Sequence, residues 1–385
     1  MLGEAHGSLG AQNSESLTFA NPSMVGNGAS APVLDGDIWG HAVGNSALDQ
    51  PFNGSLDGAC KDRTRVCASP PRSYRKPHVA RTLSAMLTTH FVYVKNFKER
   101  IIALVGDCAM AGKTGISWTN DTWNPVMGCS LVSPGCTNCY AMKQAARMER
   151  MGSPKYAGLT KVVNGSPVWT GEVRVADENT MTWPLRVRRP RLVFTNSMSD
   201  LFHEGLPRAA QFRVLDVMRE ADHHKFQVLT KRAGVMRDAV GEWLEMRGLE
   251  KMPEHVWLGV SVEDQKRADL RVPVLASIPC PVRFLSMEPL LGPVTLVHLP
   301  TMEWVIVGGE SVERGRPRTD AAAFDPAWAV SLLEESRARG SAFHFKQLGC
   351  NPVSGFTLSF KGDKEDEFPD ELRVREWPKG FVMAS

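Results

Sequence analysis

The sequence lacks any long apolar run, and no stretch approaches the roughly 18 residues that a membrane-spanning helix needs. Its N-terminus also lacks the basic, apolar and small-residue order of a secretory signal peptide. Strong charge of one sign is missing too, since the 385 residues carry a formal charge of +3. These absences predict a cytoplasmic protein with no membrane contact, and they permit a nucleic-acid partner without requiring one.

Cysteine is scarce and unevenly distributed, with eight residues in the chain. Without a secretion signal, cysteines are more often thiols, metal ligands or buried apolar residues than parts of a disulfide framework. Three of them crowd the segment GCSLVSPGCTNCYA (128–141), where a closed tetrahedral metal site would need a fourth ligand. The clustered residues are Cys129, Cys136 and Cys139; the others are Cys60, Cys67, Cys108, Cys280 and Cys350.

Residues 1–110 differ from the rest of the chain. They are rich in Gly, Ser, Ala and Asn, show no sustained period of 2 or 3.6, and contain one isolated strand-like run at 101–112. Such a composition buries too little apolar surface to offset the entropy cost of ordering. We therefore predict a mostly disordered extension. Two other interpretations stay open: the region is sequence upstream of a natural start such as Met110, or it is a basic arm that binds nucleic acid.

From Thr114 onward, short β-branched or aromatic runs alternate with helical stretches. Six runs are predicted strands: 191–196, 225–230, 255–262, 282–287, 304–309 and 342–347. Helices are predicted over 208–221, where apolar residues recur every three positions, and over 325–340, which ends in basic residues and glycine. Residues 234–246 and 263–278 fit helices less cleanly, and 288–301 is too rich in Pro and Gly for a full helix.

This alternation predicts an α/β fold built from right-handed βαβ units around a parallel sheet. About six strands after the cysteines favour a partial or full (β/α) barrel over residues 111–352, with 353–385 as a tail packed on it. Polar residues follow the apolar strands, so we expect the reactive groups to meet at one rim of the barrel.

Three clustered cysteines suit two kinds of metal site. A cubane iron–sulfur cluster held by three thiolates keeps one iron open for a substrate or cofactor. A zinc ion held by the three cysteines and Cys350 or His344 also fits the Cys-x-x-Cys spacing. A redox pair would leave Cys129 unexplained. The spacing alone leaves cluster and zinc open, and the barrel context favours the cluster.

Several blocks of the chain resemble a known family. TGISWTNDTWNPVMGCSLVSPGCTNCYAMKQA is similar to the opening of phage- and prophage-associated three-cysteine-motif proteins, a largely uncharacterised family. VFTNSMSDLFHEGLP, FQVLTKRAGVMRD, VWLGVSVEDQ, RFLSMEPLLGP, WVIVGGES and FHFKQLG fit the same family, so the resemblance covers about 114–351. It leaves out the predicted extension and implies a phage setting, but no particular reaction.

More distantly, the same blocks are similar to radical S-adenosylmethionine (SAM) enzymes, especially spore photoproduct lyase. This resemblance implies a barrel of the radical SAM type and a 4Fe-4S cluster whose open iron binds SAM. It further implies reductive cleavage of SAM to a 5′-deoxyadenosyl radical, which abstracts a hydrogen from the substrate. Residues in comparable places are Ser199 with Asp200, Thr230 with Lys231, and Ser261.

Two features depart from the usual radical SAM pattern, which spaces the first two cysteines more closely. Six residues separate Cys129 from Cys136, and Asn138 replaces the aromatic residue that usually precedes the last cysteine. Tyr140 follows that cysteine instead, where we expect a helix to begin. The GGE sequence at 308–310 looks like the motif that binds the SAM amino group, but its late position predicts a rim loop facing the substrate.

Polar residues at the strand ends complete the candidate site. Carboxylates there can accept hydrogen bonds from an ammonium or ribose, and Lys231 can hold a carboxylate or phosphate. The structural alternatives are a helix-capping acid at Asp200, a solvated strand end at Lys231 and an ion pair at Glu288. The predicted metal ligands are Cys129, Cys136 and Cys139, and the predicted cofactor-binding residues are Asn196, Ser197, Ser199, Asp200, Glu204, Lys231, Ser261, Glu288, Gly308, Gly309 and Glu310.

The resemblance to radical SAM enzymes implies a radical SAM-like enzyme, and kinship with spore photoproduct lyase and a phage setting imply a nucleic-acid base or nucleotide as its substrate. A reductase or flavodoxin-like protein is the expected electron donor, and a nucleic acid and a phage-encoded protein are further candidate partners. The alternative is a non-catalytic protein, stabilised by zinc or a cluster, that binds nucleic acid or a partner chain.

Overall fold

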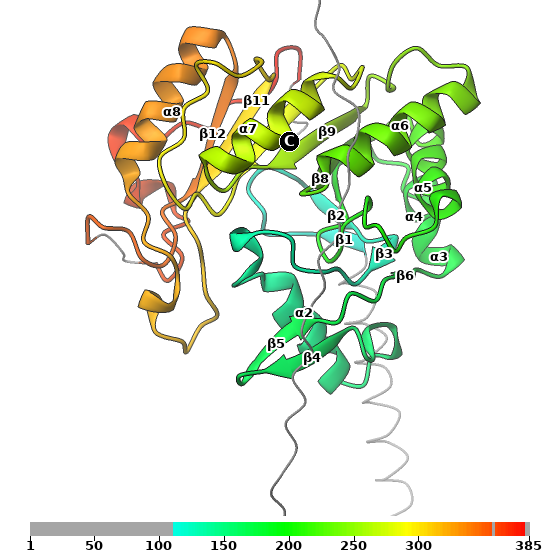
Figure 1. Ribbon diagram of the computed structural model, residues 1–385, viewed down its shortest axis with the longest axis horizontal. Helices are drawn as coiled ribbons and strands as arrows, with labels where there is room; N and C mark the ends of the chain where they lie inside the picture. The colour runs from blue at the N-terminus through cyan, green and yellow to red at the C-terminus, as the bar shows by residue number, and fades with distance from the viewer. Residues whose placement is uncertain (1–110, 356–358, 382–385) are drawn as a thin grey trace, which may run out of the picture. The chain divides into compact units, whose positions relative to one another are not determined.

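The computed structural model describes residues 111–355 and 359–381, whose arrangement is shown in Figure 1. The predicted extension, Met110, Cys60, Cys67 and Cys108 lie outside the described residues. Of the strand-like run at 101–112, only the last two residues are described, and they open β1 (Ala111–Lys113).

An eight-stranded sheet, whose strands lie side by side in chain order, forms the centre of the fold. β1 runs antiparallel to β2 (Asp121–Trp123), and all the other neighbouring strands are parallel. After β2 come β7 (Leu192–Thr195), β8 (Lys225–Thr230), β9 (Val256–Ser261), β10 (Arg283–Met287), β11 (Trp304–Gly308) and β12 (Ala342–Gln347). The six predicted strands are therefore confirmed, and the molecule is a mixed α/β protein with a largely parallel sheet.

Four long helices follow the parallel strands, as the sequence predicted. They are α5 (Arg208–Glu220), α6 (Ala233–Arg247), α7 (Gln265–Ala276) and α8 (Pro326–Arg339). α8 shows how the sequence sets its limits: the Asp325 carboxylate accepts the Ala327 N–H at 2.9 Å, and Gly340 ends the helix with φ of 72°. Residues 288–301, all described, form no helix. No helix in the described ranges is both long and apolar enough to cross a membrane.

Alternation along the strands separates two apolar clusters, one on each face of the sheet. One cluster joins the strands to the helices through residues such as Val193, Phe226 and Leu258. The other is dominated by large rings: Trp118, Phe194, Trp257, Phe284 and Trp304. Further along β9 and β10 this second face becomes polar: Ser261, four positions after Trp257, is paired in register with Ser286, two positions after Phe284. Its carboxyl end can therefore receive a polar ligand.

Between β2 and β7 the chain builds a smaller lobe that carries the cysteine segment (Figure 1). Two short antiparallel strand pairs frame it: β3 (Val126–Met127) with β6 (Arg174–Val175), and β4 (Thr160–Val163) with β5 (Ser166–Trp169). α2 (Tyr140–Arg150) packs with Tyr156, Leu159 and Trp169, which confirms the predicted helix start at Tyr140. Two short helices, α3 (Glu178–Met181) and α4 (Trp183–Arg186), lead back to the sheet.

The described part of the C-terminal tail packs on the sheet. Phe345 N–H donates to Val374 O and Glu376 N–H donates to Phe343 O, each at 2.8 Å, beside β12. Trp377 joins the cluster of large rings. The tail therefore covers the free edge of β12. Single-turn 3-10 helices complete the fold at Pro134–Cys136, Pro154–Tyr156, Arg318–Asp320, Glu365–Glu367 and Asp370–Leu372.

Candidate functional site

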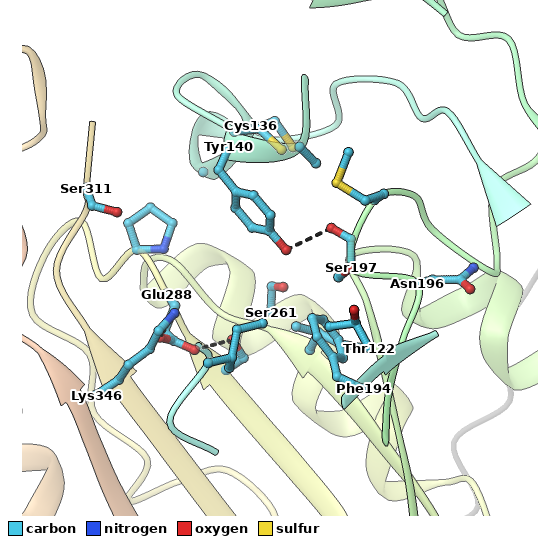
Figure 2. Close-up of a pocket in the computed structure, with 18 of the residues that line it drawn as sticks. Thr122, Cys136, Tyr140, Phe194, Asn196, Ser197, Ser261, Glu288, Ser311 and Lys346 are labelled. Atoms are coloured by element: carbon cyan, nitrogen blue, oxygen red, sulfur yellow. Dashed lines mark hydrogen bonds and ion pairs between the residues drawn. The ribbon is translucent and has the colours of Figure 1, made fainter. Parts of the chain in front are cut away.

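A cavity of about 790 Å³ opens at the carboxyl ends of the parallel strands. The strand ends bring residues from distant parts of the chain to one place, because all parallel strands finish at the same edge. The cysteine segment lines the same cavity, and Figure 2 shows Cys136 and Tyr140 across from Ser261, Glu288 and Lys346. The candidate site therefore lies between the small lobe and the sheet.

Three cysteines reach the cavity from different local structures. Cys129 follows Gly128, whose φ of 88° and position beside Glu172 O exclude a side chain, because a Cβ would lie 2.1 Å from that oxygen. Cys136 ends the 3-10 helix, and Cys139 is the residue before α2. All three thiols are free. The loop therefore presents three thiols to one cavity.

Arg232, at the end of β8, fastens the first cysteine to the sheet. Its Nη1 donates to Asp200 at 2.9 Å and lies 3.7 Å from Cys129 Sγ, and its Nη2 donates to Ser130 Oγ at 2.7 Å. Its Nε donates to Glu204 at 2.7 Å. A planar guanidinium with several fixed donors can hold such a set, which a lysine could not. The cysteine loop is thereby tied to the ends of β7 and β8.

Asn138 fastens the other end of the cysteine segment. Its Nδ2 donates to Glu310 Oε2 at 3.0 Å and to Asp320 O at 3.1 Å. The same Glu310 oxygen accepts the Ala322 N–H at 2.8 Å. The residue that stands in place of the expected aromatic therefore joins the cysteine segment to the loop after β11.

A carboxylate–ammonium pair lines the cavity below the cysteines. Glu288 Oε1 lies 2.8 Å from Lys346 Nζ, and their side chains are 12% and 25% exposed. Glu288 Oε2 accepts hydrogen bonds from Trp118 Nε1 and Ser286 Oγ, both at 3.2 Å. The pair is thus held by rigid neighbours while remaining accessible from the cavity.

Two polar side chains at the ends of β7 and β8 have unused capacity. Lys231 Nζ donates to Ser261 Oγ at 3.2 Å, and it forms no ion pair within the described part of the chain. Asn196 is 3% exposed, has φ of 65°, and neither atom of its amide finds a partner among the described residues. Buried amides are normally hydrogen-bonded, and a left-handed backbone is uncommon outside glycine. Both features mark this edge as a ligand-binding surface.

The electrostatics of the first cysteine depend on what binds there. Burial raises the pKa of the Cys129 thiol to about 12, with Asp200 adding to the rise and Arg232 opposing it. The free thiol is therefore protonated at neutral pH, and a bound metal ion would deprotonate it. Nearby, burial lowers the pKa of His203, whose Nε2 lies 2.9 Å from Ser130 Oγ. That imidazole is therefore neutral at neutral pH.

A comparison with protein families covers this whole region. A family model described as "Protein of unknown function (DUF5131)" matches residues 113–373, which is more than half of the chain. The chain belongs to the DUF5131 family. No curated protein and no solved structure matches it. The DUF5131 match includes the cysteine segment, every parallel strand and all of the contacts described above for the candidate site.

Nearly all of the residues predicted for the site come together in this DUF5131 chain. Glu204 and Gly308 do not line the cavity: Glu204 is 60% exposed and pairs with Arg232, and Gly308 ends β11. Asp200 lines it, but both of its oxygens accept hydrogen bonds from protein groups, including Thr230. The predicted residues that line the cavity are Cys129, Cys136, Cys139, Asn196, Ser197, Ser199, Asp200, Lys231, Ser261, Glu288, Gly309 and Glu310. Their roles toward a cofactor stay predictions.

Three residues that shape the site were not among those predicted for it. Arg232 and Asn138 hold the cysteine loop, and the Tyr140 ring lines the cavity. Arg232 carried a signal, because it lies two residues after the apolar strand β8. Asn138 carried none, since its partner Glu310 lies 172 positions away.

The three thiols of the cavity are the type of donor that an iron–sulfur cluster takes. Within the described ranges, no three His, Cys, Asp or Glu side chains are placed to hold one metal ion. Neither Cys350 nor His344 lines the cavity, and they contact Val312 and Ser117 instead. A cubane takes each thiolate on a different iron, so its ligands need not converge on one point. Thiolates are also the ligands that such clusters prefer.

Proposed function

We propose that this chain is a radical SAM-like iron–sulfur enzyme in which Cys129, Cys136 and Cys139 hold a 4Fe-4S cluster. One observation carries the proposal: three free thiols from one loop line a cavity at the carboxyl ends of a parallel sheet. Three thiolates leave one iron of a cubane open. When bound, such a cluster supplies the electron that cleaves SAM to methionine and a 5′-deoxyadenosyl radical, which abstracts hydrogen from a substrate.

The residues around the cavity supply positioning and charge. Arg232 and Asn138 hold the two ends of the cysteine segment against the sheet and its loops. Lys231 and Ser261 offer an ammonium and a hydroxyl to a carboxylate such as that of SAM. The unpaired amide of Asn196 offers a donor and an acceptor to an ammonium or ribose.

The order of the strands supports a (β/α) barrel of the radical SAM type. All parallel strands are neighbours in chain order, as in a barrel wall. The segment after β1 also contacts β12, with Ser117 Oγ lying 3.0 Å from His344 Nε2. The resemblance described above supports a phage setting, a nucleic-acid base or nucleotide as substrate, and a reductase or flavodoxin-like electron donor in the cytoplasm.

Reductive cleavage of SAM tests the proposed function. The full chain is reconstituted anaerobically with iron and sulfide and given SAM and dithionite, and 5′-deoxyadenosine is measured by chromatography. We expect product from the wild type and from Cys280→Ala, whose cysteine lies outside the cavity. Alanine variants of Cys129, Cys136 or Cys139 are expected to give none. No product from wild type with a full complement of iron would refute SAM cleavage.

A further inference from the structure

The side chain of Tyr140 is more exposed than is usual for an aromatic residue. In the described part of the chain it is the only aromatic residue among the large apolar side chains that are exposed, with 55% of its surface accessible. It also lines the cavity, next to Cys139. Aromatic rings have a large apolar surface that is usually buried in the protein core or at an interface. An accessible ring inside a cavity therefore has apolar area available for a ligand.

The ring is held in place although it is accessible. Tyr140 is the first residue of α2, and its hydroxyl donates to Ser197 O at 2.8 Å. Figure 2 shows the side chain reaching from the cysteine loop toward Ser197 at the end of β7. Anchored at both ends, the ring needs no rearrangement to accept a flat partner, which lowers the entropy cost of binding.

The surroundings of the ring narrow the class of partner. Across the cavity lie the carboxylate of Glu288, the ammonium of Lys346 and the hydroxyl of Ser261, as Figure 2 shows. These groups accept and donate hydrogen bonds. A wholly apolar ligand would displace water from these groups without replacing its hydrogen bonds, whereas a flat ring with polar edges can hydrogen-bond to their remaining N–H groups and lone pairs.

We infer that Tyr140 is a stacking surface for a planar heterocycle with a polar edge, such as a nucleobase. This chemistry has two sources in the proposed reaction: the adenine of SAM and a base of the substrate. The identity of the ligands rests on the proposed function, but the stacking contact can be measured without turnover.

Binding measurements on the full chain test the inference. Calorimetric titrations use two probes: S-adenosylhomocysteine alone, and the four deoxynucleoside monophosphates with S-adenosylhomocysteine saturating. The variants are Tyr140→Leu, which removes the ring, and Tyr140→Phe, which removes only the hydroxyl. Leu131→Ala is the matched control, because Leu131 is 45% exposed in the same segment but does not line the cavity.

We expect Tyr140→Leu to weaken binding of one probe by about 5- to 150-fold, the factor that corresponds to base stacking of about 1–3 kcal/mol. Tyr140→Phe and Leu131→Ala should stay within about threefold of wild type. Weakened S-adenosylhomocysteine binding identifies the adenine of SAM as the partner, and weakened nucleotide binding identifies a substrate base.

Two results would overturn the inference: Tyr140→Leu binds both probes as tightly as wild type, or the wild type binds neither. Circular dichroism and the melting temperature of Tyr140→Leu confirm folding, and its iron content should equal that of wild type. Loss of affinity at full iron content separates a failure of stacking from a failure of the cluster. Intact stacking without 5′-deoxyadenosine would instead reject the proposed reaction.

Discussion

Replacing Arg232 by glutamine tests the buried clamp on the cysteine loop. The Arg232 and Asp200 side chains are 3% and 7% exposed and lie 2.9 Å apart. Removing one partner of such a pair costs about 3–5 kcal/mol, because the other charge is left buried. Asp200 would keep hydrogen bonds from Thr230 and the Phe202 N–H, so we expect the lower end, about 3 kcal/mol.

The ion pair of Arg232 with Glu204 serves as the control for its ion pair with Asp200. Arg232 pairs with Glu204 at 2.7 Å, but that carboxylate is 60% exposed. Exposed pairs contribute about 0–1 kcal/mol, since water already solvates both charges. Glu204→Gln should therefore cost about 1 kcal/mol or less, although it removes a hydrogen bond from the same guanidinium.

Urea unfolding measures the free energy of unfolding of the wild type and four variants. The variants are Arg232→Gln, Asp200→Asn, Glu204→Gln and the Arg232→Gln/Asp200→Asn double mutant. The double mutant should lose at least about 1 kcal/mol less than the sum of its single mutants, because the two side chains are in direct contact. Equal losses for Arg232→Gln and Glu204→Gln, or additivity within about 0.5 kcal/mol, would refute the reasoning.

Two further predictions concern the sheet. Gly259→Ala places a Cβ 2.5 Å from the Phe284 ring, so the free energy of unfolding should fall by about 1–3 kcal/mol. Gly241→Ala on α6 has open space around its Cβ, so its free energy of unfolding should rise by about 1 kcal/mol. No fall for Gly259→Ala would contradict the packing of Gly259 against Phe284. Burial, then Arg375 and Lys346, lowers the pKa of His344 to about 3. Between about pH 6.5 and this value the unfolded chain binds a proton that the folded chain does not, so stability falls as pH drops. His344→Gln should make the free energy of unfolding fall less steeply between pH 7 and pH 4, and an unchanged slope would argue against it.

The six strands from β7 to β12 could be predicted because each is an apolar run of four to six residues followed by a polar turn. The gathering of the cysteines with Ser261 and Glu288 followed from the same pattern, since the strands end at one edge. β2, with three residues, and the strands of the small lobe, with two to four residues each, are too short to show a period. Those elements depend on tertiary contacts instead.

The partners of individual side chains could not be predicted from the sequence. Lys231 and Arg232 are adjacent basic residues, and only Lys231 was among the predicted cofactor-binding residues. Of these two residues, only Lys231 has no ion pair in the described ranges, because the Arg232 guanidinium pairs with Asp200. Glu288 forms the ion pair expected for it, with Lys346, and it also lines the cavity, while its role toward a cofactor stays a prediction.

The claim that the three cysteines hold an iron–sulfur cluster is tested most directly by metal content. The full chain is purified and reconstituted anaerobically, and its iron, sulfide, zinc and visible spectrum are measured. A brown protein with about four irons per chain is expected, as one cubane requires. Alanine at Cys129, Cys136 or Cys139 should bleach it, and Cys280→Ala should not. A colourless protein with one zinc and no iron after reconstitution would contradict the proposal.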